Sequence, residues 1–210
     1  MTRTVKDPDV RRGEILIAAG ELFRTQGYLD TSVEAIIRKA GIAKGTFYYY
    51  FQSKEEVLAS IVHEMVNGMV EASQTVAQDA SLNALEKIRL ILREQSRISD
   101  SGHDFVEDLH RPENREFHEK SNVETVLVFA PIMARVVEQG VKEGIWNTEK
   151  PLETVQFILA GSQFLLDTNL FHWDPQELLK RTQAMQMIIE RALAAPEGSF
   201  GFLTERYFKA

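Results

Sequence analysis

Residues 31–54 carry the pattern that most constrains the fold, because they predict two short helices joined by a glycine turn. Thr31 with Glu34 three positions later has the spacing of a capping box, which predicts the start of the first helix. Gly41 predicts its end, since glycine tolerates the left-handed conformation that a helix stop needs. One face is apolar at helical spacing, through Val33, Ile36, Ile37 and Ala40. The segment up to Gly41 is therefore predicted to be a short amphipathic helix.

The second short helix follows the glycine and has two chemically different sides. Its inner side is aromatic, through Phe47, Tyr50 and Phe51. Its outer side carries a cation and hydroxyl groups, through Lys44, Thr46, Tyr48 and Tyr49. Two short helices around a turn, the second of which presents such groups, are typical of a helix-turn-helix that enters the major groove of DNA. The pattern therefore predicts a DNA-binding domain.

The same stretch resembles the DNA-binding domain of the TetR family of bacterial transcriptional regulators. The resemblance runs from about Ile15 to Leu58 and is carried by the ordered segments 26–32, 36–48 and 51–55. It implies an N-terminal three-helix domain, joined by a long helix to a larger helical domain that binds a small molecule and forms a homodimer. The rest of the chain resembles the family only in its helical content and helix lengths. The resemblance therefore does not identify the ligand.

Charge is distributed unevenly between the two predicted domains, a DNA-binding domain over residues 1–54 and a ligand-binding and dimerisation domain over residues 55–210. The whole chain of 210 residues has a net charge of −7, which by itself argues against a nucleic-acid partner. Residues 1–54, however, hold nine Lys and Arg against six Asp and Glu, whereas residues 55–210 hold 15 against 25. A mildly basic head on an acidic body fits a DNA-binding regulator, although chance clustering also explains so small an excess.

Apolar residues recur at helical spacing in the body, and no part of it alternates with the period of a strand, so the predicted fold class is all-α. A first helix is predicted over 9–26. Ser53 with Glu56 predicts the start of a long helix that joins the head to the body. Prolines then divide the body. Together with the apolar spacing, they predict helices over about 82–99, 104–111, 113–143, 152–171 and 175–195. The helix over 113–143 has a predicted kink at Pro131, and a break near Ser121-Asn122 is an open alternative.

Five residues of the second short helix are candidate DNA contacts. Lys44 lies in the first turn, which points into the groove, and donates either to guanine O6 and N7 or to a phosphate. Gly45 has no side chain and lets the backbone approach the DNA closely. Thr46 suits a thymine methyl or a phosphate, and the hydroxyls of Tyr48 and Tyr49 suit phosphate oxygens. The aromatic inner side leaves these two tyrosines no core to join.

Two residues outside that helix are further candidates for phosphate contacts. Thr31 stands at a helix N-terminus, where a phosphate binds well, although a capping role alone also explains this threonine. Lys54 lies in the first turn of the long helix, so it also stands at a helix N-terminus where a phosphate can bind. The family resemblance implies a phosphate contact for this lysine. A double-stranded DNA operator is therefore the expected partner.

The body contains aromatic, methionine and histidine side chains that have two interpretations. Packing on one another in a filled core is the ordinary explanation. The family resemblance implies instead a cavity among these helices that is apolar with a few polar groups. In that interpretation an apolar or aromatic small-molecule effector contacts Met65, Met69, Phe105, Phe117, Phe129, Met133 and Phe164, while His103, His110 and His118 orient it.

Two stretches of the body are apolar around more of the helix than the surface helix of a monomer needs. They are Val126–Ala130 and Phe157–Ala160. Each requires cover on two sides, from its own chain and from a partner. Together with the resemblance, this predicts a homodimer held by the helices near 123–143 and 152–171.

Enzymatic and membrane functions find no support in the sequence. His63-Glu64 begins like a zinc-protease motif but lacks the second histidine, since position 67 is Asn67. The other histidines are spaced too widely to share a helix face as a close metal-binding pair. We therefore predict no enzyme activity, no cofactor and no metal. The chain has no cysteine, and its N-terminus does not resemble a signal peptide. A membrane span needs about 20 consecutive apolar residues, and no stretch approaches that length. The expected location is therefore the cytoplasm, without membrane contact.

Two alternatives stay open at this stage. If the body holds no cavity, the chain is a ligand-independent DNA-binding activator or architectural protein. If an enzymatic activity survives the loss of Lys44 and Tyr49, the chain is a helical enzyme with an incidental helix-turn-helix. The sequence assigns no role to residues 196–210.

Overall fold

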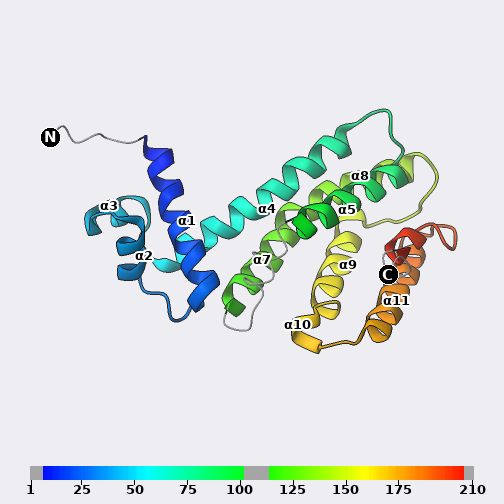
Figure 1. Cartoon of the computed structure of the whole chain (residues 1–210). Helices are drawn as coiled ribbons and strands as arrows, with labels where there is room; N and C mark the ends of the chain where they lie inside the picture. Colours follow the sequence, from blue (N-terminus) through cyan, green and yellow to red (C-terminus); the bar gives the residue numbers. More distant parts are fainter. Residues whose placement is uncertain (1–6, 102–113, 206–210) are drawn as a thin grey trace. The chain divides into compact units, whose positions relative to one another are not determined.

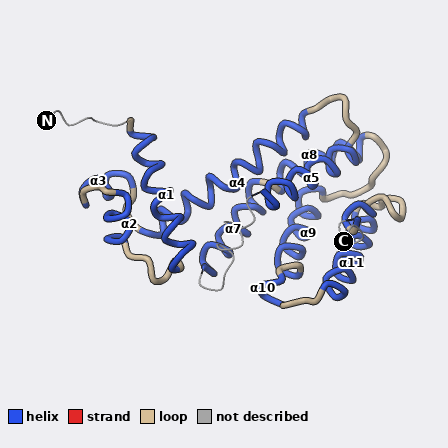
Figure 2. The backbone as a smooth tube through the Cα atoms, viewed as in Figure 1, coloured by secondary structure: helices blue, strands red, loops and turns tan. Residues whose placement is uncertain are grey.

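The computed structural model describes residues 7–101 and 114–205, and every regular element in these two stretches is a helix (Figure 2). The all-α fold class is therefore confirmed. None of the described helices is long and apolar enough to cross a membrane. In the order labelled in Figure 1, the elements are α1 (Pro8–Gln26), α2 (Val33–Ala40), α3 (Lys44–Tyr50), α4 (Lys54–Gln78), α5 (Ala84–Ser101), α7 (Arg115–Val128), α8 (Ala130–Lys142), α9 (Pro151–Leu165), α10 (Thr168–Phe171), α11 (Pro175–Ala192) and η2 (Gly201–Leu203).

The chain divides into two compact units. The first contains residues 1–65 and 102–121, and therefore α1, α2, α3 and the beginnings of α4 and α7. The second contains residues 66–101 and 122–210, and therefore α5, the remainders of α4 and α7, and all later helices. The first three helices thus form one unit with the first part of α4. A functional boundary after residue 54 stays a prediction.

The helix-turn-helix begins one residue later than the sequence pattern predicts. Ser32 caps α2, because its Oγ accepts a hydrogen bond from a backbone N–H of the first turn at 3.1 Å. The predicted capping box of Thr31 with Glu34 is therefore wrong. Thr31 is only 2% exposed and its hydroxyl donates to the Gly27 carbonyl at 2.7 Å, so it closes the turn before the helix. Gly41 ends α2 in the left-handed conformation, with a φ of 63°, as predicted.

The core of the first unit fixes α3 in place. One large side chain from each helix is 1% exposed or less: Phe23 from α1, Ile36 from α2, Phe47 from α3 and Leu58 from α4. Burying such side chains stabilises the unit by about 1.5–3 kcal/mol each. Because Phe47 is one of them, the rotation of α3 about its own axis is set by this core.

In the second unit, α8 is the central helix, and it packs against α5 and α9. The single helix predicted over 113–143 is instead two, α7 and α8, interrupted at Phe129. Pro131 explains the interruption, because proline has no N–H to donate to the carbonyl of Leu127. The residues of α8 that are buried are Ala130, Ile132, Met133, Ala134, Val136, Val137 and Gly140.

The last predicted helices differ from the structure in detail. The segment 152–171 divides into α9 and α10, and the final helix ends at Ala192. Beyond it the chain turns through Ala194, which has a φ of 47°, and continues to η2. The helix predicted over 104–111 lies outside the described residues.

Candidate nucleic-acid interface and apolar cavity

The inner side of α3 is aromatic and closed to solvent. Phe47 and Phe51 are at most 1% exposed, and their ring centroids lie 6.1 Å apart. The guanidinium of Arg12 covers the Phe51 ring at 5.2 Å from its centroid. Tyr50, the third residue predicted to face inward, is half-buried. The predicted inner side of the helix is thus confirmed.

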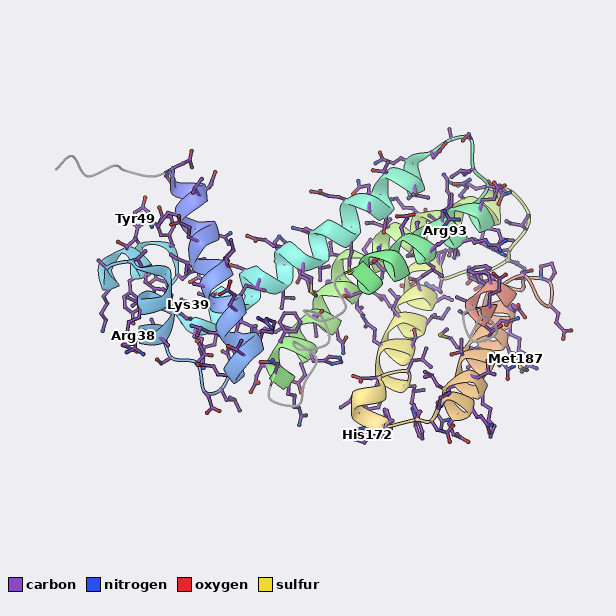
Figure 3. All side chains as sticks on the ribbon, viewed as in Figure 1. Arg38, Lys39, Tyr49, Arg93, His172 and Met187 are labelled. Atoms are coloured by element: carbon purple, nitrogen blue, oxygen red, sulfur yellow. The ribbon has the colours of Figure 1, made fainter. Side chains whose placement is uncertain are left out.

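The outer side of α3 faces solvent. Tyr49 is 77% and Tyr48 is 38% exposed, and Lys44 and Gly45 are exposed as well. Thr46 is half-buried. Figure 3 shows the Tyr49 side chain projecting outward from α3. Four of the five predicted contact residues of this helix are therefore exposed, and Thr46 is partly covered.

The contacts of Lys44 with the described residues are ones that a binding partner can displace. Its Nζ lies 3.8 Å from Glu34 Oε1, and the two side chains are 67% and 62% exposed. The same Nζ lies 5.9 Å from the centroid of the Tyr48 ring. Exposed ion pairs of this kind contribute little to stability and are screened by salt. The ammonium group is therefore available to a phosphate or a base.

Lys54, unlike Lys44, is engaged by the turn after α1. Its Nζ donates to the carbonyls of Tyr28 at 2.7 Å and Leu29 at 3.3 Å, and it lies 4.2 Å from the centroid of the Tyr28 ring. This lysine and the buried Thr31 thus organise the same turn. Their predicted phosphate contacts stay predictions, and the hydrogen bonds of both side chains argue for a structural role.

Asn114 and Glu55 complete this turn, and the sequence analysis identified neither. The Asn114 side chain accepts from the backbone N–H of Tyr28 at 2.8 Å and donates to the Phe23 carbonyl at 3.2 Å. The Tyr28 hydroxyl donates to Glu55 Oε1 at 3.2 Å. Burial raises the pKa of Tyr28 to about 12, and the nearby carboxylates of Glu55 and Glu116 add to the shift. The phenol therefore stays protonated.

Two basic residues at the end of α2 were also missed. Arg38 is exposed and points outward in Figure 3. Lys39 is paired with Glu21, with 2.6 Å between Nζ and Oε2. Two adjacent cations before the glycine turn are the signal that would have identified them. Arg38 is the more accessible candidate for a phosphate contact.

The second unit contains an apolar cavity of about 230 Å³. Its wall includes Phe129 and Met133, so the structure brings together two of the ten predicted ligand contacts. Among the described residues that line it, Ser162 is the one polar residue, and the serine hydroxyl donates to the Ile158 carbonyl within α9. The remaining lining residues come from α5, α8, α9, α11 and the segment after α11, and are Ile88, Leu92, Val137, Val155, Ile158, Leu159, Met185, Ile189, Leu193, Phe200 and Leu203.

Five of the other predicted ligand contacts lie in the described residues, and none of these five lines the cavity. Met65 and Met69 are half-buried in α4, and Phe117 is buried in the first unit. Phe164 is 56% exposed, and its ring makes an edge contact with Phe171 at 5.2 Å. His118 lies in α7, which contributes no residue to the cavity wall. Phe105, His103 and His110 lie outside the described residues.

In addition to the cavity, the second unit has an apolar surface that is exposed to solvent and lies on α9 and α11. On α9, Phe157 is 82% exposed, and on α11, Met187 and Ile188 are 49% and 60% exposed. Figure 3 shows Met187 projecting away from its helix. The contribution of α11 to this surface was not predicted. In the predicted segment 123–143, Val123 and Leu127 of α7 are 59% and 61% exposed, whereas seven residues of α8 are buried.

Comparisons with known proteins agree with this architecture. The family model described as bacterial regulatory proteins of the tetR family matches residues 15–61, and the model described as the C-terminal domain of tetracyclin repressor-like proteins matches residues 97–188. The fatty acid metabolism regulator protein of Bacillus subtilis (strain 168) is 28% identical to this chain over 134 residues. The match covers 62% of this chain and 68% of that protein.

Solved structures share the fold. The fatty acid degradation regulator FadR from Bacillus halodurans has a TM-score of 0.63 and 22% identity, and the match covers 92% of this chain and 99% of that chain. SmeT, the repressor of a Stenotrophomonas maltophilia multidrug efflux pump, was solved with triclosan. That complex has a TM-score of 0.62 and 18% identity, with 90% and 94% of the two chains covered.

The helical fold and the open outer side of α3 thus define a DNA-binding transcriptional regulator of the helix-turn-helix class. The chain belongs to the tetR family of bacterial regulatory proteins.

Proposed function

We propose that the chain acts as a homodimeric repressor that a small, largely apolar molecule releases from its operator. Each subunit inserts α3 into the major groove of one half of a near-palindromic site. Two-fold symmetry places the half-sites about 34–36 Å apart, or a multiple of this distance. Because the operator is genomic DNA, the protein acts in the cytoplasm.

The observation that carries the DNA-binding proposal is the contrast between the two sides of α3. A core that includes Phe47 fixes the helix, while Tyr49 is left 77% exposed beside an exposed lysine. Gly45 adds to the argument, because a Cβ built there meets nothing within 4 Å and its φ is not positive. The fold itself does not require a glycine at this position. Close approach of DNA to the backbone explains it.

The outer side of α3 supplies both kinds of contact that a DNA-binding helix needs. Lys44 contacts a guanine edge or a phosphate, and the hydroxyls of Tyr48, Tyr49 and Thr46 contact phosphates. Arg38 extends the phosphate contacts to the end of α2. Thr31 and Lys54 hold the turn that presents these helices, and any phosphate contact of theirs is additional.

A second copy of the chain is the proposed occupant of the apolar surface on α9 and α11. Phe157 and Ile188 are too exposed to contribute to the core of their own subunit. Monomers rarely leave several large apolar side chains exposed on neighbouring helices. An obligate interface buries about 2,000 Å² or more in total, so residues beyond these exposed side chains also contribute to it.

The cavity of the second unit is the proposed ligand site. Its volume of about 230 Å³ lies between the about 150 Å³ that holds a benzene molecule and the about 300 Å³ of the smallest drug-sized pockets. Burying a charge against this wall is costly, since no lining side chain is charged. The part of the ligand that occupies the cavity is therefore uncharged. Relatives named for fatty acid metabolism and a fold neighbour solved with triclosan support an apolar ligand.

Release needs only a modest coupling between the ligand and the DNA. A ligand that favours the non-binding arrangement by about 1–3 kcal/mol lowers operator affinity about 5- to 150-fold. The decisive experiment selects bound fragments from the source genome and then titrates one fragment with and without apolar compounds. Specific binding that a compound relieves supports the proposal. Specific binding that no compound in a broad panel relieves favours the ligand-independent alternative.

A further inference from the structure

The segment 196–205, called the strap here, forms part of the wall of the apolar cavity. It follows the left-handed turn at Ala194 and contains η2. Phe200 and Leu203 of the strap line the cavity, together with residues of α5, α8, α9 and α11. The strap therefore covers part of the cavity, and moving it widens the access to the cavity without displacing a long helix.

The first half of the strap is firmly held. Glu190 is 5% exposed and accepts hydrogen bonds from the backbone N–H of Phe200 and the side-chain amide of Gln186, both at 3.0 Å. The Phe200 ring is 1% exposed, and its centroid lies 5.9 Å from that of Trp146. Detaching this half takes one of two hydrogen bonds from a buried carboxylate and exposes an aromatic ring, so it is costly.

The contacts that tie the second half to α5 are exposed. Arg89 pairs with Glu205, with 3.2 Å between Nη2 and Oε1, and the two side chains are 59% and 50% exposed. The Arg89 guanidinium also lies 5.6 Å from the centroid of the Phe202 ring. Exposed ion pairs and cation–π contacts hold weakly. The second half is thus tied to α5 by exposed contacts, while Phe202 and Leu203 also pack against the core of the unit.

We propose that the second half of the strap, Gly201–Glu205, is the gate through which the ligand reaches the cavity. Leu203 is the side chain that closes the opening, and Arg89 is the latch, because its contacts with Glu205 and Phe202 hold this segment against α5. Ile88 and Leu92, which flank Arg89 on α5, line the cavity, so the latch and the cavity wall share one helix. The inference rests on the ligand site proposed above.

A gate changes the rates of binding and leaves the equilibrium unchanged, because the ligand crosses the same barrier in both directions. Arg89→Gln is expected to raise the association and dissociation rate constants of an uncharged apolar fluorophore, N-phenyl-1-naphthylamine, by the same factor of up to about fivefold. Stopped-flow fluorescence on the full chain measures both constants. Lys180→Gln, which breaks an exposed pair with Glu177 elsewhere in the same unit, is the matched control and leaves both unchanged.

Locking the gate gives the opposite change. The chain has no cysteine, so Arg89→Cys combined with Glu205→Cys offers a single pair of thiols for a short bismaleimide. The crosslinked protein is expected to bind and release the fluorophore about tenfold or more slowly than the same variant before crosslinking. Equal rates before and after crosslinking, with binding intact, overturn the gate and leave the ligand site standing.

Filling the cavity separates failure of the gate from failure of the ligand site. Val137→Phe adds a ring to the cavity wall from α8, and Leu159→Phe does the same from α9 if the first variant melts early. Loss of fluorophore binding in a folded variant places the fluorophore in the cavity. Binding that survives both substitutions, or that is absent from the wild-type protein, removes the ligand site and the gate with it.

Discussion

The side chain of Asn114 accepts a hydrogen bond from the backbone N–H of Tyr28, 86 residues earlier, with 2.8 Å between N and Oδ1. The same amide donates to the Phe23 carbonyl at the end of α1, so both of its polar atoms are used. Asn114 is 1% exposed. Because the turn that contains Tyr28 leads into α2, this one side chain anchors the start of α7 to the helix-turn-helix.

Replacing Asn114 by alanine leaves a buried N–H and a buried carbonyl without partners. We expect Asn114→Ala to lower the free energy of unfolding by about 2–3 kcal/mol, and to accelerate hydrogen exchange at the Tyr28 amide. Urea unfolding and exchange measured by NMR check the two effects. Arg115→Ala, which removes the neighbouring exposed side chain, is the control. Equal stability of the two variants would show that the Asn114 bridge contributes little.

The raised pKa of Tyr28 predicts a loss of stability in alkali. Burial, and then the charge of Glu55, hold its pKa near 12, compared with an ordinary value of 10. The folded state therefore keeps a proton that the unfolded chain releases, so this contribution is complete below pH 10 and decreases as the pH rises toward 12. Wild-type protein should lose stability relative to Tyr28→Phe across this range, as measured by urea unfolding at several pH values. A difference that stays constant with pH would contradict the assignment.

Two glycines in helices predict opposite responses to alanine. A Cβ at Gly140 lies 2.1 Å from Trp146, so Gly140→Ala forces the ring to move and should cost about 1–3 kcal/mol. At Gly68 a Cβ meets nothing within 4 Å, so Gly68→Ala should stabilise α4 by about 0.5–1 kcal/mol. Thermal melting of both variants tests the pair. Similar melting temperatures for the two would refute the packing of Gly140 against Trp146.

The proposed dimer predicts which exposed apolar residues matter. Phe157→Asp and Ile188→Asp place a charge in the interface formed by α9 and α11, and each is expected to yield monomers at micromolar concentration and to abolish specific operator binding. Light scattering measures the mass. Ile17→Asp is the control in the light-scattering measurement only. It changes a residue of α1 that is 66% exposed and lies outside the proposed interface. A dimer that survives both α9 and α11 substitutions would refute the interface.

Short-range patterns predicted much of the first unit. The glycine stop of α2, the aromatic inner side of α3 and the helix bounds depend on residues a few positions apart, which a sequence displays directly. The misplacement of the α2 cap shows the limit of such patterns. Thr31 and Ser32 are both good caps, and the choice depends on the backbone conformation of the turn, which brings the Thr31 hydroxyl to the Gly27 carbonyl.

The second unit was less predictable because its site is made by long-range packing. Helical spacing marks the apolar residues of α8, α9 and α11 but does not say whether a given side chain faces the core, the cavity or a partner. Phe129 and Phe164 show the difficulty, since both are aromatic residues in apolar stretches. The first lines the cavity and the second is 56% exposed. The strap was missed because residues 196–205 form only one short 3₁₀ helix and carry no motif.

The central claim is that the outer side of α3 binds operator DNA. The most direct measurement is a fluorescence anisotropy titration of a selected genomic fragment at several salt concentrations. The variants are Lys44→Ala and Tyr49→Phe, with Arg93→Ala, an exposed arginine of α5 (Figure 3), as the control.

We expect both α3 variants to bind more weakly and the control to bind like the wild-type protein. If Lys44 contacts a phosphate, its loss reduces the salt slope by about two per dimer, one for each subunit. If it contacts a guanine, its loss relaxes the preference at one base pair of each half-site by about 1–3 kcal/mol. If both α3 variants kept the affinity, the salt slope and the sequence preference of the wild-type protein, operator binding by the outer side of α3 would be contradicted.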